Sequence, residues 1–194
     1  MITDLKHMGK FHVDFMRVVL DLPHEEIAKY TIDFVENNCD RYTTYHDHEV
    51  NKQWQQGLPS RNDLEADLHK LGREFTGRTK RKEFKEDPFL FYWASVYKTG
   101  DQHGSHNHPN SLIAGTYYPQ VSKESSTITF EAPWGSHIMH DSIDFSESLF
   151  DYKPNSGDAM LWPSWINHRV PVQKESDTLR VAISFNMDYK KYHD

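Results

Sequence analysis

Residues 102–118 read QHGSHNHPNSLIAGTYY, and the interpretation of the whole chain starts from this stretch. Three histidines, His103, His106 and His108, precede a Pro-Asn-Ser turn signal and an apolar run. Positions i and i+2 of an extended strand point to the same face, so the rings of His106 and His108 can reach one ion. The pattern predicts a metal site at the edge of a sheet.

A chelating pair of histidines needs a third ligand, and residues 157–186 supply one in GDAMLWPSWINHRVPVQKESDTLRVAISFN. His168 lies in this segment, and Arg180 follows twelve positions later within a strongly alternating run. His103 is offset by three from His106, which does not keep one strand face. We therefore expect His103 to contact a metal ligand or the substrate instead of the metal.

The segments HNHPNSLIAGTYY, GDAMLWPSWINHRV and LRVAISFN resemble the iron(II)- and 2-oxoglutarate-dependent oxygenases. The resemblance covers about Phe89 to Asn186. It is to the prolyl-hydroxylase-like branch, and in particular to a 2-oxoglutarate/iron oxygenase family of phages and bacteria. It implies a mainly β fold with flanking helices, a cupin-like double-stranded β-helix or jelly-roll barrel with the metal at one open end. It also implies iron(II), 2-oxoglutarate as co-substrate and ascorbate as an optional reductant.

The identity of the second metal ligand stays open at this point. In the wider superfamily the first motif is His-x-Asp or His-x-Glu, whereas here the third position is His108. Three imidazoles give iron(II) less charge compensation than two imidazoles and a carboxylate. The second ligand is thus either His108 or a carboxylate, Glu131 or Asp158.

Arg180 carries the prediction about the co-substrate. In LRVAISFN, Arg180 and Ser184 share one face of the alternating strand. A guanidinium fork there can bind a carboxylate through two hydrogen bonds, and the resemblance implies that this carboxylate is the distal one of 2-oxoglutarate, with Ser184 as a further donor. The resemblance also places Tyr97 and Tyr118 like tyrosines that contact 2-oxoglutarate.

Composition limits the classes of partner. The chain has 194 residues and a formal charge of −7, from 29 acidic and 22 basic residues, which disfavours bulk binding to nucleic acid or anionic membranes. Cys39 is the only cysteine, so an internal disulfide and a cysteine-based zinc site are excluded. No signal-peptide pattern begins the chain. We expect a soluble, intracellular, cytoplasmic protein.

The pattern along the chain predicts one domain, 1–194, in which 1–87 supports a jelly-roll core at 88–194. We expect helices at 23–38 and 60–75, the second capped by Ser60 or Asn62. Residues 40–58 are expected to be a solvated loop, whose His46-x-His48 binds no metal. Predicted strands cover 11–20, 89–97, 112–118, 127–130, 159–162 and 179–187. The basic cluster at 77–85 is either a solvated loop or a patch for an acidic or phosphorylated substrate.

These observations favour an iron(II)- and 2-oxoglutarate-dependent dioxygenase that hydroxylates a substrate and releases succinate and CO2. Two alternatives remain at this stage: a non-catalytic jelly-roll binding or structural protein, and a cupin-type metalloenzyme without 2-oxoglutarate. Arg180 separates them, because neither alternative needs an inward-facing cation. The substrate, whether a peptide side chain, a nucleobase or a small metabolite, and the oligomeric state are left open by the sequence.

Overall fold

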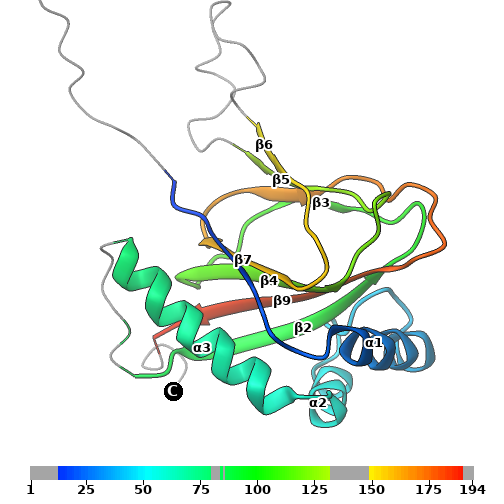
Figure 1. The fold of residues 1–194 in the computed structure, drawn as a ribbon, viewed down its shortest axis with the longest axis horizontal. Coiled ribbons are helices and arrows are strands. Elements are labelled where there is room, and N and C mark those ends of the chain that lie inside the picture. The colour runs from blue at the N-terminus through cyan, green and yellow to red at the C-terminus, as the bar shows by residue number, and fades with distance from the viewer. Residues whose placement is uncertain (1–12, 80–83, 85, 132–148, 190–194) are drawn as a thin grey trace, which may run out of the picture.

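The computed structural model describes residues 13–79, 84, 86–131 and 149–189 (Figure 1). Its helices are α1 (His24–Asn38), α2 (His48–Gly57) and α3 (Arg61–Arg78). Its strands are β1 (Met16–Val19), β2 (Phe89–Tyr97), β3 (His103–His106), β4 (Ile113–Gln120), β5 (Ile128–Glu131), β6 (Leu149–Tyr152), β7 (Asp158–Pro163), β8 (His168–Val170) and β9 (Arg180–Asp188).

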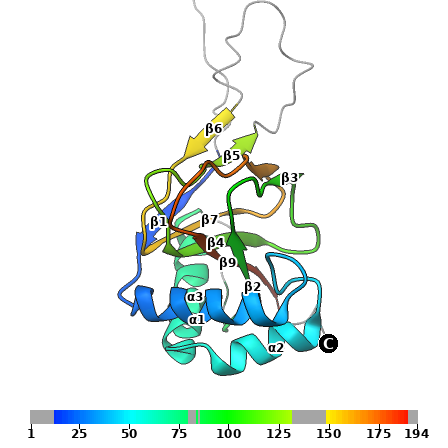
Figure 2. The ribbon, with the colours of Figure 1, turned by 90° about the vertical axis from the view of Figure 1, so that its right-hand side faces the viewer.

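The strands form two antiparallel sheets with the orders β1-β7-β4-β9-β2 and β3-β8-β5-β6. The three helices lie on one side of the larger sheet, and the smaller sheet lies on the other (Figure 2). Buried residues of the two inner faces pack together, among them Phe130 against Trp162 and Val170 with Tyr118. The predicted jelly-roll fold, mainly β with flanking helices, is confirmed.

Alternate side chains of strand β9 point to the two opposite faces of the larger sheet. Val181, Ile183, Phe185 and Met187 are buried in the core between the larger sheet and the helices. The residues between them therefore face the smaller sheet, and Ala182 packs there with Tyr118 and Val170. Arg180 and Ser184 share this inner face, as predicted.

The prediction of a loop over residues 40–58 is wrong, because α2 occupies His48–Gly57. The sequence of this helix, HEVNKQWQQG, is mostly polar and shows no apolar stripe, so the helix was not predicted. It contributes only Asn51 and Trp54 to the buried interior. Asp47 is the N-cap of this helix, and its side chain accepts hydrogen bonds from the backbone N–H of Glu49 and Val50. His46 and His48 belong to no cluster of metal-ligating side chains among the described residues.

The observed boundaries of other elements agree more closely with those predicted from the sequence. Helix α1 starts one residue after the predicted Pro23, and α3 runs from Arg61 to Arg78. Ser60 precedes α3 in a left-handed conformation and makes no side-chain cap, so the predicted capping by Ser60 is wrong. The predicted strand at 11–20 is shorter, Met16–Val19, and residues 11–12 lie outside the described part.

Three short strands, β3, β6 and β8, of three or four residues each, were not predicted. Most of the basic cluster at 77–85 lies outside the described residues, and the prediction of a single domain stays a prediction. No helix in the described part of the chain is long and apolar enough to cross a membrane.

Candidate metal and co-substrate site

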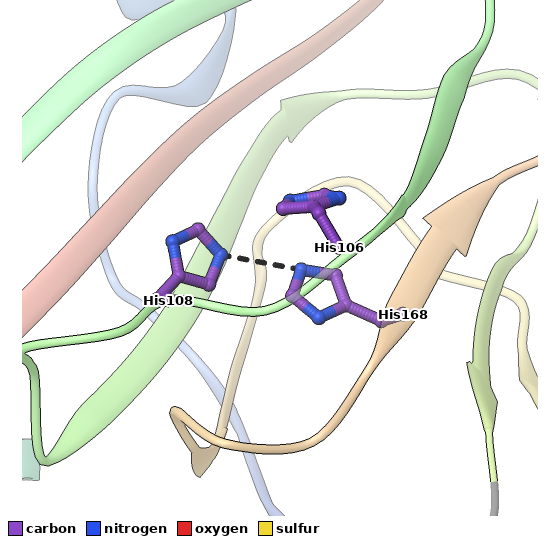
Figure 3. A group of neighbouring side chains, drawn as sticks. All are labelled: His106, His108 and His168. Carbon is purple, nitrogen blue, oxygen red and sulfur yellow. Dashed lines mark hydrogen bonds between the residues drawn. The ribbon is translucent and has the colours of Figure 1, made fainter.

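The side chains of His106, His108 and His168 come together in space (Figure 3). One ring nitrogen of each lies within 4.8 Å of those of the other two, and the Nε2 atoms of His108 and His168 are 3.3 Å apart. His106 ends β3 and lies opposite His168 in the pairing with β8, whereas His108 follows the end of β3. We call these three residues the histidine triad.

Backbone contacts orient two of the rings. His106 Nδ1 lies 2.8 Å from the carbonyl oxygen of Gly104, and His168 Nδ1 lies 3.0 Å from that of Ile166. A carbonyl oxygen only accepts hydrogen bonds, so both Nδ1 atoms carry the proton and donate. In the neutral rings the Nε2 lone pairs are then available to a metal, which is the usual arrangement of a ligating histidine.

The surroundings of His108 and His168 keep these two imidazole rings neutral. Burial, followed by the proximity of His106, lowers the pKa of His168 to about 3, and the same causes lower the pKa of His108 to about 4. Aromatic rings surround the site: Trp162 and Phe130 lie beside His168, with ring centroids 4.9 and 5.9 Å away, and Trp93 lies 5.9 Å from His108. Neutral nitrogen is the form that binds metal, so the site is prepared for a cation.

Neither carboxylate considered from the sequence lies in the triad. Asp158 is buried at the opposite end of β7 from Trp162, and its oxygens accept hydrogen bonds from Arg17, Tyr152 and the backbone of Asn155. Burial alone would raise the pKa of Asp158, but the hydrogen bonds from Arg17 and Tyr152 lower it below its ordinary value. The carboxylate is fully used in an ion pair of 2.6 Å with Arg17.

Glu131 lies beside a residue that pairs with the triad, but its side chain is on the opposite face of β5. Its neighbour Phe130 is opposite His168 in the pairing of β5 with β8, and the Phe130 ring contacts His168. Adjacent residues of a strand point to opposite faces, so the side chain of Glu131 points away. The geometry therefore favours His108 over either carboxylate as the second ligand.

Arg180 is a buried cation, 2% exposed, on the inner face of β9. Its Cζ lies 4.8 Å from the ring centroid of Tyr97 and 5.1 Å from that of Tyr118. Its Nε and Nη1 atoms are buried and have no hydrogen-bond partner among the described residues, which also offer it no ion pair. Unpaired buried charge is costly, so this pocket suits an anion.

The remaining predicted co-substrate residues line the same inner face. Burial raises the pKa of Tyr97 to about 12, although Arg180 opposes the shift, and it also raises the pKa of Tyr118. Both phenols stay protonated, and the Tyr118 hydroxyl makes no well-formed hydrogen bond in the described part of the chain, although Thr116 and Arg180 lie close enough to oppose the rise of its pKa. Ser184 Oγ lies 3.3 Å from Thr116 Oγ1, and Ser184 is opposite Trp93 in the pairing of β2 with β9. Ser184 thus lies toward the triad, about 13 Å along the strand from Arg180.

Two aromatic neighbours of the triad, Trp93 and Phe130, were not predicted as site residues. Trp93 shares its strand face with Tyr97, so the alternation of β2 was a signal for it. Trp162 contacts His168 and is buried, whereas Trp165, three residues later, is 49% exposed.

Comparison with protein families bears on this geometry. Residues 91–186 match the family described as "Putative 2OG-Fe(II) oxygenase". The matched segment belongs to this family. It contains the histidine triad, Arg180 and both tyrosines, so the residues that form the site are those of an oxidoreductase family that uses iron(II) and 2-oxoglutarate. No curated protein matches the chain.

Solved structures of oxygenases share the fold. A prolyl-4-hydroxylase from Pseudomonas putida aligns with a TM-score of 0.57 and 10% identity, over 91% of this chain and 85% of that one. SnoK, a non-heme alpha ketoglutarate dependent carbocyclase from nogalamycin biosynthesis, aligns with a TM-score of 0.59 and 13% identity, over 90% and 79%. At these identities the likeness shows the jelly-roll fold alone.

Lengths differ among the solved oxygenases. An oxidoreductase of the 2OG-Fe(II) oxygenase family from Burkholderia pseudomallei aligns over 68% of this chain, with a TM-score of 0.48 and 11% identity. The present chain spans 57% of the length of that protein.

Proposed function

We propose that this protein is an iron(II)- and 2-oxoglutarate-dependent dioxygenase that hydroxylates a C–H bond of its substrate. The observation that carries the proposal is Arg180, a buried guanidinium with two unpaired donor atoms on the inner face that also leads to the triad. A cation in this position is explained by an anionic ligand that enters the protein from outside. The distal carboxylate of 2-oxoglutarate is such a ligand, and Arg180 would bind it through two parallel hydrogen bonds.

The histidine triad would hold the metal. Three protein ligands on one face of an octahedral ion leave positions for a co-substrate and dioxygen. His106 and His168 would bind through Nε2, because their Nδ1 protons are donated to backbone carbonyls. With three neutral ligands the iron(II) keeps its full charge, which favours an anionic co-substrate beside it.

Iron(II) and 2-oxoglutarate, when bound, supply the oxidation: one oxygen atom of O2 enters succinate as CO2 is released, and the other enters the substrate. The protein positions and shields these reactants. Tyr97 and Tyr118 would flank the carboxylate held by Arg180, and Thr116 and Ser184 lie on the face between that pocket and the triad. The aromatic rings beside His108 and His168 limit the access of water.

We propose the prime substrate only by class: it is a peptide side chain, a nucleobase or a small metabolite. Solved structures of this fold include a prolyl-4-hydroxylase and the carbocyclase SnoK, so the fold is compatible with hydroxylation without selecting it, and hydroxylation is part of the proposal. The proposed location is the cytoplasm, since a single cysteine and a ferrous cofactor suit reducing conditions.

An anaerobic titration tests the proposal without a known substrate. Protein loaded with iron(II) should develop a metal-to-ligand charge-transfer band as 2-oxoglutarate is added, and it should release succinate slowly when air is admitted. A protein that binds iron(II) without developing this band would favour a cupin-type metalloenzyme that does not use 2-oxoglutarate. A protein that binds neither would favour the non-catalytic jelly-roll.

A further inference from the structure

His103 lies between the two halves of the proposed site. It begins β3, where the pairing with β8 matches His103 to Val170 and His106 to His168. Three steps on one strand thus oppose two on the other, which is a β-bulge. In a regular strand His103 and His106 would point to opposite faces, but the bulge brings their rings into a stack, with centroids 4.2 Å apart and planes at 15°.

The other side of the His103 ring contacts the co-substrate pocket. His103 Nδ1 lies 3.5 Å from the hydroxyl of Tyr97, whose ring is the one 4.8 Å from Arg180. Tyr97 is also directly opposite Arg180 in the pairing of β2 with β9. A continuous series of contacts therefore runs from His106 through His103 and Tyr97 to Arg180.

One contact in this series, between the Tyr97 hydroxyl and His103 Nδ1, is long. A separation of 3.5 Å is at the outer limit for a hydrogen bond, while the stack of His103 on His106 is already close. A contact that strengthens on binding is what couples two sites, because coupling requires a difference between the free and bound states.

We propose that His103 is a positioning residue that couples occupancy of the Arg180 pocket to metal binding at His106. This inference rests on the proposed function. A carboxylate on Arg180 fixes the Tyr97 ring beside it, the Tyr97 hydroxyl then bonds firmly to His103, and the stacked His103 ring holds His106 in its ligating orientation. By reciprocity, a metal on His106 favours the same arrangement at Arg180.

The test measures iron(II) affinity anaerobically, with and without saturating 2-oxoglutarate. The ratio of the two affinities is the coupling factor. His103→Phe keeps a flat ring for the stack and loses the nitrogen, and Tyr97→Phe keeps the ring beside Arg180 and loses the hydroxyl. We expect each variant to bind iron(II) alone within twofold of wild type and to lose at least fivefold in the coupling factor. The double variant should lose no more than either single one.

Tyr42→Phe is the matched control. The Tyr42 ring lies 4.9 Å from the Tyr97 ring and its hydroxyl donates to the carbonyl oxygen of Gln102, so the variant removes a neighbouring hydroxyl outside the series. It should keep the wild-type coupling factor. A wild-type coupling factor in His103→Phe, or losses that multiply in the double variant, would overturn the inference while leaving the proposed function intact. A wild-type protein that binds iron(II) but not 2-oxoglutarate would overturn both.

Discussion

Replacement of Arg180 should abolish tight co-substrate binding with little effect on the metal. Arg180→Ala removes the two buried donors, Nε and Nη1, that have no partner in the described protein. Each hydrogen bond to a charged group contributes about 1.5–3 kcal/mol, so the two together give about 3 kcal/mol or more. At 1.4 kcal/mol per tenfold, affinity for 2-oxoglutarate should fall roughly a hundredfold or more.

Two further substitutions at this position separate charge from geometry. Arg180→Lys keeps the charge but loses the planar fork, so its affinity for 2-oxoglutarate should lie between those of wild type and Arg180→Ala. Arg180→Met fills most of the same space without the charge. Because the described residues give the guanidinium no counter-ion, Arg180→Met should lower 2-oxoglutarate affinity without lowering the free energy of unfolding.

The assay is 2-oxoglutarate titration of the iron-loaded variants without oxygen, with iron(II) affinity measured in parallel. Ser184→Ala is the control on the same strand face: because Ser184 lies about 13 Å along the strand from Arg180, it should lower 2-oxoglutarate affinity much less than Arg180→Ala does. Equal 2-oxoglutarate affinity in wild type and Arg180→Ala would refute the reasoning, because the pocket would then have no need of its cation. Loss of iron(II) affinity in Arg180→Ala would show a general disturbance of the site.

Three other predictions concern the metal, pH and packing. Alanine at any position of the histidine triad should cut iron(II) affinity at least tenfold, whereas Asp158→Asn and Glu131→Gln should leave it within twofold. Isothermal titration of the protein with iron(II) measures these affinities. The reverse pattern would make a carboxylate the ligand. The unfolded chain protonates histidine near pH 6.5 but the folded chain protonates His168 only near pH 3, so metal-free stability should fall as pH falls below about 6.5. Urea unfolding at pH 7 and pH 5 checks this. His168→Gln should reduce the difference without abolishing it, because His103 and His108, whose pKa values are lowered to about 4, contribute in the same direction. Gly115→Ala should destabilise the fold by about 1–3 kcal/mol, because its Cβ would lie 2.2 Å from the Phe185 ring; an unchanged melting temperature would contradict this.

The sequence predicted those parts of the site that depend on local spacing. The two-residue offset of His106 and His108 and the alternation around Arg180 are periodic signals: the two histidines lie together with His168, and Arg180 and Ser184 lie on one strand face. His108 nevertheless lies beyond the end of β3, so its position depends on the loop, where its backbone N–H donates to the carbonyl oxygen of Ser164.

The features that sequence reasoning missed depend on distant partners. Asp158 could not be excluded as a ligand, because its ion-pair partner Arg17 is 141 positions away. The stack of His103 on His106 follows from a bulge that only the pairing with β8 reveals. Helix α2 was missed because most of its residues are polar and it buries little surface of its own.

The alternation of β9 also bears on how such a protein can change its chemistry. Its outward residues, Val181, Ile183, Phe185 and Met187, anchor the sheet to the helices, while Ala182, Ser184 and Asn186 face inward. Ala182 is buried against Tyr118 and Val170, but Ser184 and Asn186 are only partly buried, so mutations at these two positions can remodel the shape and polarity of the inner face with little loss of the hydrophobic support behind it. Libraries randomised at Ser184 and Asn186 should yield many folded members, and libraries randomised at Val181, Ile183, Phe185 and Met187 should yield few.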